Sequence, residues 1–452
     1  MNNYIHYMTA FFVTFTIIAA TITTIPVGAE THSKIENGVM PEPEQVPVKE
    51  NEQLPETPIQ KLSVLLERAS ELVFELETQQ ADSSQTQPNP FADRAINRIN
   101  NTAIKLYRNL SDNRNENLVF SPLSFYQAFS VVYLGAENET AKQFRNVLDL
   151  DLFAPEHDFN SPELQTANAV WLLDKKVELQ KSFLKTIDAL GNDIFRTMEP
   201  VDALAAINDW FNEKTKGRIP KLFDNLDRDT KLIIGNAVYF KGQWEEPFEK
   251  AFTKDEPFYS LSGKEQKVPT MHNYLHVPYF KDKDYAFILL PYKNGKYSMN
   301  IILPDKGVDF KKFKEQINRI INAMTGKLPA GAPVKKRDVE LSLPKFEIES
   351  TFNFTTFLPA LGITDAFNDK ADFSGMTVKM EDALQIGQAI QKANITVDEE
   401  GTVAAAATGI AMKVMSAAPE EEPVVFKADR PFIYFIIDNV TGLIVFIGDK
   451  IK

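Results

Sequence analysis

The chain has 452 residues, 44% of them apolar and 11% aromatic, and a formal net charge of −13 at pH 7. This much apolar material can bury a large core, which excludes a wholly disordered chain and predicts one or two globular domains. The sequence has no cysteine, which excludes disulfides, thiolate nucleophiles and thiolate metal sites, so stability must come from core packing in a large domain.

The first 29 residues have the pattern of a secretory signal. Their apolar run, "MTAFFVTFTIIAATITTIPVGA", ends in Val27-Gly28-Ala29, which is typical of a signal-peptidase site. No Lys or Arg precedes the run, so a signal anchor is the alternative. We predict a signal peptide over residues 1–29 and a secreted, extracellular protein. No other stretch of the sequence is long and apolar enough to span a bilayer, which argues against a membrane partner.

Residues 30–92 differ in composition from the rest of the chain. Between residues 30 and 90 there are 12 acidic residues and 4 basic ones, and such a charged segment is typical of disorder. Apolar residues between 62 and 76 recur at helical spacing and predict one short amphipathic helix. We interpret residues 30–92 as an acidic, largely disordered extension, and as a solvated tail rather than a site that captures a basic partner.

A globular domain is predicted from about residue 93 to residue 452. "ADRAINRINNTAIKLYRNL" has helical periodicity, whereas "KLIIGNAVYFKGQW", "YAFILLPYKNGKYSMNIILP" and "RPFIYFIIDNVTGLIVFIGD" are strand-like runs in which "YKNGKY" and "DNVTGL" predict hairpins. Helices dominate before about residue 220, strands follow, and helices return near 310–325 and 352–362. This order predicts an α+β fold.

Motifs of enzymes are missing from the sequence. A Ser-His-Asp site would have to use His157, His272 or His276, and the sequence has no Gly-x-Ser-x-Gly elbow, dinucleotide fingerprint or phosphate loop. His272 and His276 have the spacing of a helical zinc pair, but Asn273 stands where a zinc protease has Glu and the flanking residues predict strands. We therefore predict no enzyme activity, no metal and no cofactor. The basic run 335–337 is short on a chain of pI ≈ 5.1, which argues against nucleic acid as a partner.

Seven stretches of the domain, in chain order, carry a family resemblance. They are "NLVFSPLSFYQAFSVVYLGAENETAKQF", "INDWFNEKTKGRIPKLF", "LIIGNAVYFKGQWEEPF", "LSLPKFEIES", "LGITDAFNDKADFSGM", "EEGTVAAAATGIAMKVMSAAPEEEP" and "FKADRPFIYFIIDNVTGLIVFIGD". Together they resemble the serpin family of serine protease inhibitors. The resemblance implies an α+β serpin fold with three β-sheets, eight or nine helices and an exposed reactive-centre loop over about residues 399–425.

The loop implied by the resemblance is a bait for a serine protease. In inhibitory relatives, cleavage of the loop is followed by its insertion as a new central strand, which drags the acyl-linked protease across the body of a monomeric inhibitor. Such a segment needs a permissive hinge and then small residues. The implied hinge residues are Glu399, Glu400, Gly401, Thr402, Ala404, Ala405, Ala406 and Ala407. An alanine-rich helix is the alternative, and it accounts for neither Gly401 nor the flanking strands.

Counting along the loop as in inhibitory relatives places the scissile bond at Met415-Ser416, which suits a protease with an apolar primary pocket, of elastase or chymotrypsin type. Lys413-Val414 is the alternative bond, for a trypsin-like enzyme. A non-inhibitory serpin that acts as a carrier, storage protein or chaperone is the alternative function. Relatives of that kind usually carry charged or bulky hinge residues, so Thr402 and the four alanines favour an inhibitor.

The resemblance also assigns residues to the region where the large sheet opens. They are Ser121, Ser124, Asn236, Trp244, Lys345 and Gln391. The resemblance places Lys345 in an ion pair with Glu399 at the top of that sheet. Gln391 replaces a family histidine beneath the sheet, and Val403 replaces the usual Glu in the hinge.

Two further features of the sequence concern the surface of the domain. The chain between "YLGAENET" and "TANAVWLL" is shorter than usual by about one helix, so we expect no heparin activation through that helix. Six sequons are candidates for glycosylation in a secreted chain. They begin at Asn100, Asn109, Asn138, Asn353, Asn394 and Asn439. Asn394 lies in the strand that leads to the hinge, and we expect it to be buried and to carry no glycan.

Overall fold

The computed structural model describes most of residues 90–452, and these residues belong to one compact unit. The gaps in this range are residue 113, 151–160, 175, 190–192, 197–199, 228–229, 326–333, 380–383 and 402–421. The predicted signal peptide lies outside the described residues, as does the predicted extension up to residue 89. Residues 90–92, which we had assigned to the extension, already belong to the first described helix.

Eight α-helices lie in the described ranges, within the expected eight or nine. They are α3 (Pro90–Ser111), α4 (Pro122–Gly135), α5 (Asn138–Leu148), α6 (Lys181–Ala189), α7 (Pro200–Lys214), α8 (Phe310–Glu315), α9 (Ile317–Thr325) and α10 (Phe354–Ala360). The short helices begin where the sequence supplies a cap: the side chain of Ser121 accepts the amide of Ser124 before α4, and that of Asn353 accepts the amide of Thr355 before α10. No α-helix occurs in the described residues between α5 and β2, but residues 151–160 lie outside them.

The larger sheet has nine strands in the order β1-β14-β13-β8-β7-β6-β9-β12, with β5 on the side of β6. Its strands are β1 (Leu118–Phe120), β5 (Lys254–Tyr259), β6 (Glu265–Lys281), β7 (Tyr285–Pro291), β8 (Tyr297–Pro304), β9 (Lys335–Pro344), β12 (Val424–Lys427), β13 (Phe432–Asp438) and β14 (Ile444–Lys450). We expected three sheets, but hydrogen bonds connect the described strands into two. The reason is β6, which has 17 residues and pairs with β5 along its first residues, with β9 along its middle and with β7 at its end.

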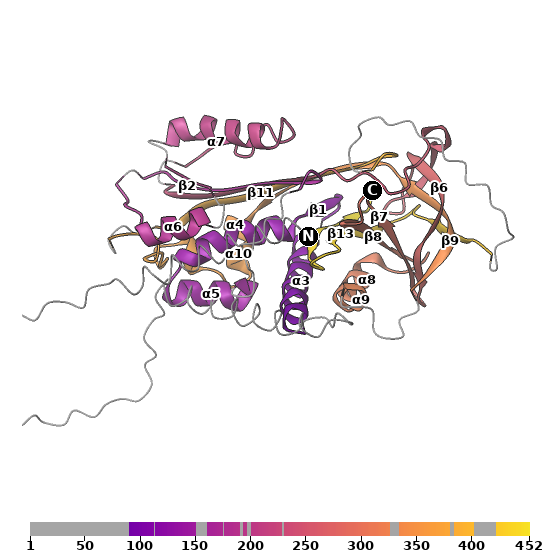
Figure 1. Ribbon diagram of the computed structural model, residues 1–452, viewed down its shortest axis with the longest axis horizontal. Helices are drawn as coiled ribbons and strands as arrows, with labels where there is room; N and C mark the ends of the chain where they lie inside the picture. The colour runs from indigo at the N-terminus through magenta and orange to yellow at the C-terminus, as the bar shows by residue number, and fades with distance from the viewer. Residues whose placement is uncertain are drawn as a thin grey trace, which may run out of the picture. The chain divides into compact units, whose positions relative to one another are not determined.

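The smaller sheet has five strands in the order β10-β11-β4-β2-β3. They are β2 (Leu164–Leu172), β3 (Asp193–Arg196), β4 (Leu232–Phe240), β10 (Phe346–Asn353) and β11 (Ile386–Val397). Helix α7 covers one face, while α4 and α10 lie against the other (Figure 1). The central strand β4 is therefore buried on both of its faces, which explains why "LIIGNAVYF" is a continuous apolar run in which all nine residues are buried.

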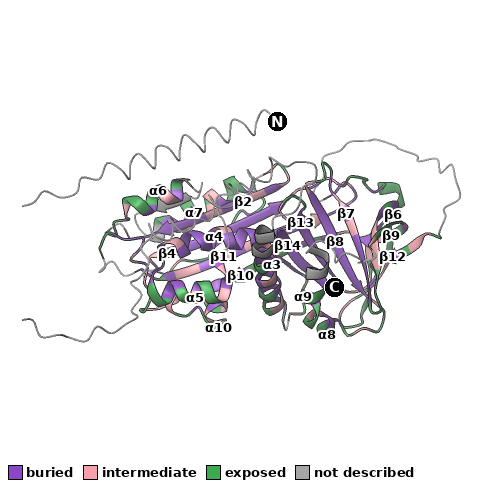
Figure 2. Ribbon diagram, turned by 60° about the horizontal axis from the view of Figure 1, so that its bottom comes forward, coloured by how far each residue is buried: buried purple, intermediate pink, exposed green. Residues whose placement is uncertain are grey.

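Two apolar cores hold the helices on this sheet. Trp171 of β2 and Phe211 of α7 pack edge to face at 5.3 Å in the smaller core. A Cβ at Gly235 of β4 would come within 2.6 Å of the Phe211 ring, so glycine at this position lets α7 approach the strand. The larger core runs on the other face and continues into the nine-stranded sheet. Figure 2 shows the buried residues following the central strands of both sheets.

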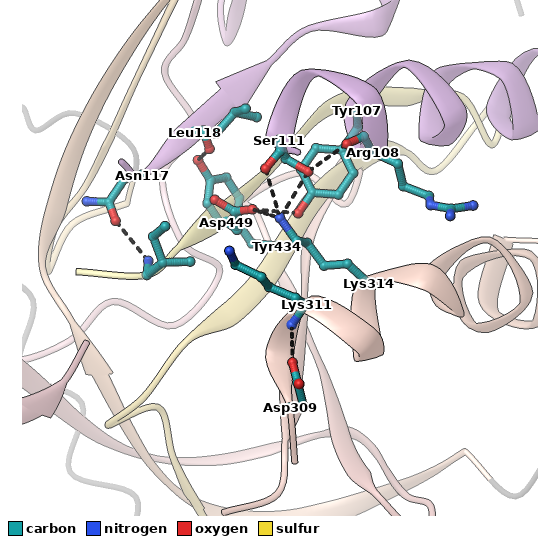
Figure 3. Close-up of polar contacts among 11 residues, drawn as sticks. Tyr107, Arg108, Ser111, Asn117, Leu118, Asp309, Lys311, Lys314, Tyr434 and Asp449 are labelled. Carbon is teal, nitrogen blue, oxygen red and sulfur yellow. Dashed lines mark hydrogen bonds and ion pairs between the residues drawn. The ribbon is translucent and has the colours of Figure 1, made fainter. Parts of the chain in front are cut away.

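A buried polar cluster joins α3, α8 and β14 within the larger core (Figure 3). Asp449 accepts a hydrogen bond from the Tyr107 hydroxyl at 2.9 Å, and its Oδ2 lies 3.6 Å from the Lys314 ammonium. Lys314 also donates to the carbonyl oxygen and the hydroxyl of Ser111, both at 3.1 Å. Burial raises the pKa of the Asp449 carboxyl to about 6, although Lys314 and Tyr107 lower it in part. The folded state therefore binds a proton at Asp449 more tightly than the unfolded chain does.

Because of Asp449, we expect the folded protein to become less stable as the pH rises. Its pKa is raised on folding, so its contribution is fully present below the unfolded value of 3.8 and is lost as the pH rises through about 6. The change amounts to roughly 2–3 kcal/mol in the free energy of unfolding. We expect Asp449→Asn, which cannot ionise, to remove this slope. Thermal unfolding of both proteins from pH 4 to pH 7 measures it, and parallel pH profiles for the two would contradict the prediction.

Candidate functional site

The chain that leaves β11 is fixed at one end of the seam between β4 and β11. These two strands are parallel neighbours, paired from Ile386 and Leu232 to Asn394 and Tyr239. Gly401, the last described residue before the gap at 402–421, forms an antiparallel bridge with Gln243, shortly beyond the end of β4. Gly401 therefore lies beside the seam between β4 and β11. The resemblance implies that a cleaved loop would insert into this seam.

Gly401 is required by the backbone geometry at this point. Its φ is +148°, and a Cβ would come within 2.0 Å of the Gly242 carbonyl oxygen, so no other residue fits without a shift of the backbone. The Asp398 side chain accepts the amides of Glu400 and Gly401 at 3.0 and 3.2 Å. The Trp244 indole donates to the Asp398 carbonyl at 2.9 Å. These bonds hold the turn that precedes the predicted insertion segment.

Glu399 and Lys345 form the predicted ion pair at the end of the seam. The Lys345 ammonium lies 2.7 Å from Glu399 Oε2, and the Thr253 hydroxyl donates to Oε1 at 2.7 Å. Burial of Glu399, which is 3% exposed, would raise the pKa of its carboxyl. The hydrogen bonds from Lys345 and Thr253 outweigh burial and hold that pKa below its ordinary value. The carboxylate is therefore charged at neutral pH, and its ion pair with Lys345 stabilises this end of the seam.

We expect Glu399→Lys to destabilise this end of the sheet by about 2 kcal/mol, because it removes a hydrogen-bonded carboxylate and puts a second ammonium beside Lys345. If β4 and β11 separate more easily at this end, polymers of the protein should form on prolonged warming. Size-exclusion chromatography measures the fraction of polymer. Lys250→Ala is the matched control, since the Lys250–Glu400 pair is close at 2.8 Å but the Lys250 side chain is 66% exposed. A Glu399→Lys protein that stays monomeric would count against the role of the pair.

A buried amide network crosses the seam below this point. Gln391 of β11 and Asn236 of β4 are directly paired, and the Gln391 amide donates to Asn236 Oδ1 at 2.6 Å. Gln391 also donates to the Ser121 carbonyl at 3.1 Å, and Asn236 donates to the Ser124 carbonyl at 2.8 Å. Two strands and the start of α4 are thereby joined by uncharged side chains.

Comparison with known proteins identifies the family. The family model described as "Serpin (serine protease inhibitor)" matches residues 97–452. An uncharacterized serpin-like protein of Thermococcus kodakarensis is 34% identical over 78% of this chain and 84% of its own. The leukocyte elastase inhibitor of Bos taurus is 33% identical over 76% and 96%. The solved structure of the thermophilic serpin tengpin in its native state has a TM-score of 0.71 at 30% identity, covering 82% of this chain and 96% of the other.

The chain belongs to the serpin family. Its fold is the α+β serpin fold that the resemblance implied. The structure brings Lys345, Glu399 and Trp244 together at one end of the seam and Gln391 and Asn236 within it. The reactive bond at Met415-Ser416, its alternative at Lys413-Val414 and the hinge residues from Thr402 to Ala407 lie outside the described residues.

Some contacts of this serpin's seam were missed by the sequence analysis. Thr253 and Lys250, which contact Glu399 and Glu400, and Asp398, which holds the turn, carry no motif of their own. Lys250 and Glu400 are 150 positions apart in the chain, so only the fold can reveal the pair. Asp398 could have been found, because a short acidic side chain before Gly401 is typical of a turn that caps its own backbone.

The histidines considered for zinc lie on a strand of this serpin. His272 and His276 are both in β6, as their flanking residues predicted. Each faces its own carboxylate: His272 Nε2 lies 3.2 Å from Glu256 and His276 Nδ1 lies 2.9 Å from Asp338. The described part of the chain contains no group of three or more side chains suited to a metal ion. None of its helices is both long and apolar enough to cross a membrane.

Proposed function

We propose that this serpin is a secreted, monomeric suicide-substrate inhibitor of serine proteases and not an enzyme. The observation that carries the proposal is the parallel seam between β4 and β11, at whose end Gly401 lies. A strand that follows Gly401 and enters the seam would run antiparallel to both neighbours. One parallel pairing would be replaced by two antiparallel ones, and parallel pairing is slightly the less stable of the two.

Loop insertion supplies the energy that inhibition needs. A strand as long as β11, which has 12 residues, would add about ten hydrogen bonds worth 0.5–1.5 kcal/mol each, or on the order of 10 kcal/mol. This is comparable to the stability of a whole domain. It is enough to distort an acyl-linked protease and to misalign the oxyanion hole that deacylation requires. The native fold must then be metastable.

The names of two relatives support a protease as the target of this serpin. The leukocyte elastase inhibitor of Bos taurus and the alpha-1-antiproteinase of Rattus norvegicus, 33% and 31% identical, cover 96% and 93% of their own lengths. Met415 at the predicted scissile bond fits the apolar pocket of an elastase- or chymotrypsin-like protease. Cleavage at Lys413-Val414 would instead point to a trypsin-like protease.

Incubation with elastase, chymotrypsin and trypsin tests the proposal. We expect a covalent complex with at least one of them, visible as a high-mass band on a denaturing gel. Cleavage of the loop without a complex for every protease would overturn the inhibitory function and favour a carrier, storage or chaperone role.

Secretion and glycosylation are part of the same proposal. Four of the six sequon asparagines are exposed, namely Asn109, Asn138, Asn353 and Asn439. Asn394 is 7% exposed within β11, as we had predicted, and Asn100 is 1% exposed with its side chain bonded to Gly442 and Ile444. We therefore expect glycans only on the four exposed asparagines, which peptide mapping of the secreted protein would measure.

A further inference from the structure

Strand β12 is a short edge strand that follows directly on the gap at 402–421. It has four residues and, among the described strands, pairs only with β9, in parallel register. Figure 2 shows it at the margin of the sheet beside β9 and β6. Val425 is 66% exposed, whereas Phe426 and the following Ala428 are buried. Four residues of parallel ladder are a weak attachment, so side chains must contribute to holding β12 in place.

A row of polar side chains crosses four strands next to β12. Lys427 of β12 lies opposite Ser342 of β9, and Ser342 lies opposite His272 of β6. The Ser342 hydroxyl is 3.2 Å from His272 Nδ1, and His272 Nε2 is 3.2 Å from Oε1 of Glu256 on β5. The other carboxylate oxygen of Glu256 is 2.8 Å from the Lys427 ammonium. Glu256, His272, Ser342 and Lys427 therefore form a ring of three side-chain contacts, which the backbone pairing of Lys427 with Ser342 closes.

The charges in this ring support one another. The Lys427 ammonium, against a smaller opposing effect of burial, holds the pKa of the Glu256 carboxyl below its ordinary value. The Glu256 carboxylate in turn raises the pKa of Lys427. Their side chains are only 23% and 42% exposed, so water screens the pair less than it screens a fully exposed one. Both groups are charged at neutral pH and attract each other across the sheet.

We propose that Glu256, His272, Ser342 and Lys427 form a latch that holds β12 on the sheet and sets how often this strand detaches. The backbone adds two bonds at the same place: the Ala428 amide donates to Ser342 at 2.9 Å, and the Tyr259 amide of β5 donates to Asp429 at 2.8 Å. The latch thus acts where the chain passes from β12 into the core, and it connects β12 to β5 across β9 and β6.

The latch has a consequence that rests on the proposed function. If the uncleaved loop entered the seam beside the 12 residues of β11, it would span about 40 Å. Residues 416–423 would then have to lead back to β12, and eight residues reach at most about 29 Å. Full insertion without cleavage therefore requires β12 to leave β9. By slowing that step, the latch keeps an uncleaved loop available to a protease.

The absence of cysteine allows a direct measurement of β12 detachment. Ala428, 2% exposed, is replaced by cysteine, and the rate of its modification by a thiol reagent reports how often the strand opens. In this background we expect Glu256→Gln and Lys427→Met each to raise the rate about three- to tenfold. The double variant should be no faster than the faster single one, because both changes break the same contact.

Two controls separate the latch from general destabilisation. Lys281 and Asp305 form an ion pair of 2.7 Å on the same sheet, with similar side-chain exposures of 44% and 36%, away from β12, so Asp305→Asn should leave the rate unchanged. In a second protein the cysteine is placed away from β12, by Ser130→Cys in α4, where Ser130 is 3% exposed. None of the latch substitutions should raise the rate at which this cysteine is modified.

Equal modification rates at Ala428→Cys with and without the latch substitutions would overturn the proposal, and so would parallel increases in the Ser130→Cys background. If Ala428→Cys does not fold, amide hydrogen exchange of the peptide containing β12, compared between the natural protein and Glu256→Gln, gives the same decision. These measurements need no target protease, so they can fail or succeed independently of the covalent-complex experiment.

Discussion

If this serpin inhibits by loop insertion, as we propose, Thr402→Arg is expected to turn it into a substrate of the protease. Residue 402 follows Gly401 at the end of the seam, where the facing strand β4 is buried along all nine residues. A guanidinium that enters such a place without a partner costs several kcal/mol. Insertion competes with deacylation, and each 1.4 kcal/mol added to its barrier slows it about tenfold. Most encounters should then end in a cleaved loop and a free protease.

The measurement is the stoichiometry of inhibition, read as the ratio of covalent complex to cleaved protein on a denaturing gel. Thr402→Ser is the matched control, because it changes size little and adds no charge, and it should retain the complex. If Thr402→Arg formed complexes with unchanged stoichiometry, the insertion mechanism would be wrong even though the fold is that of a serpin.

Oxidation of Met415 is the second change with a large expected effect. If Met415-Ser416 is the scissile bond, the methionine side chain fills an apolar pocket of the protease, and the sulfoxide is larger and polar. We expect mild oxidation to slow inhibition of an elastase- or chymotrypsin-like protease by about two orders of magnitude. The fold should survive, because Met271, Met299 and Met376 of the core are at most 2% exposed and are shielded from the oxidant.

Met415→Leu is the control for the other methionines, Met412 among them. It should keep inhibition and resist the oxidant, since leucine is apolar and cannot form a sulfoxide. Mass spectrometry of the released C-terminal peptide establishes the register. A peptide that begins at Ser416 supports Met415 as the bait, and one that begins at Val414 moves the bait to Lys413 and the target to a trypsin-like protease.

Hairpins and helices could be predicted because their causes are local. Asn294 and Gly295 have φ of +73° and +67° in the turn between β7 and β8, a conformation that these two residues adopt at low cost. The helices expected near 310–325 and 352–362 are present as α8, α9 and α10. The number of sheets could not be predicted in the same way, because it depends on which distant strands pair along β6.

The candidate site could be predicted only in part. The pair between Lys345 and Glu399, 54 positions apart, came from the family resemblance and not from any local pattern. Thr253, which shares the same carboxylate, escaped notice because a threonine before a strand has no distinguishing neighbours. Thr253 belongs to the site only because the fold places its hydroxyl within hydrogen-bond distance of the Glu399 carboxylate.

By itself the sequence determined where strands, helices and turns form and that a glycine and small residues follow β11, because periodicity and backbone preferences act over a few neighbouring residues. Only the tertiary structure decided that the Asp449 carboxyl is buried beside Tyr107 and Lys314, and that Lys427 reaches Glu256 across four strands. Burial and ion pairing depend on the summed packing of segments far apart in the chain, and a charged residue has the same sequence signature whether it faces water or the core.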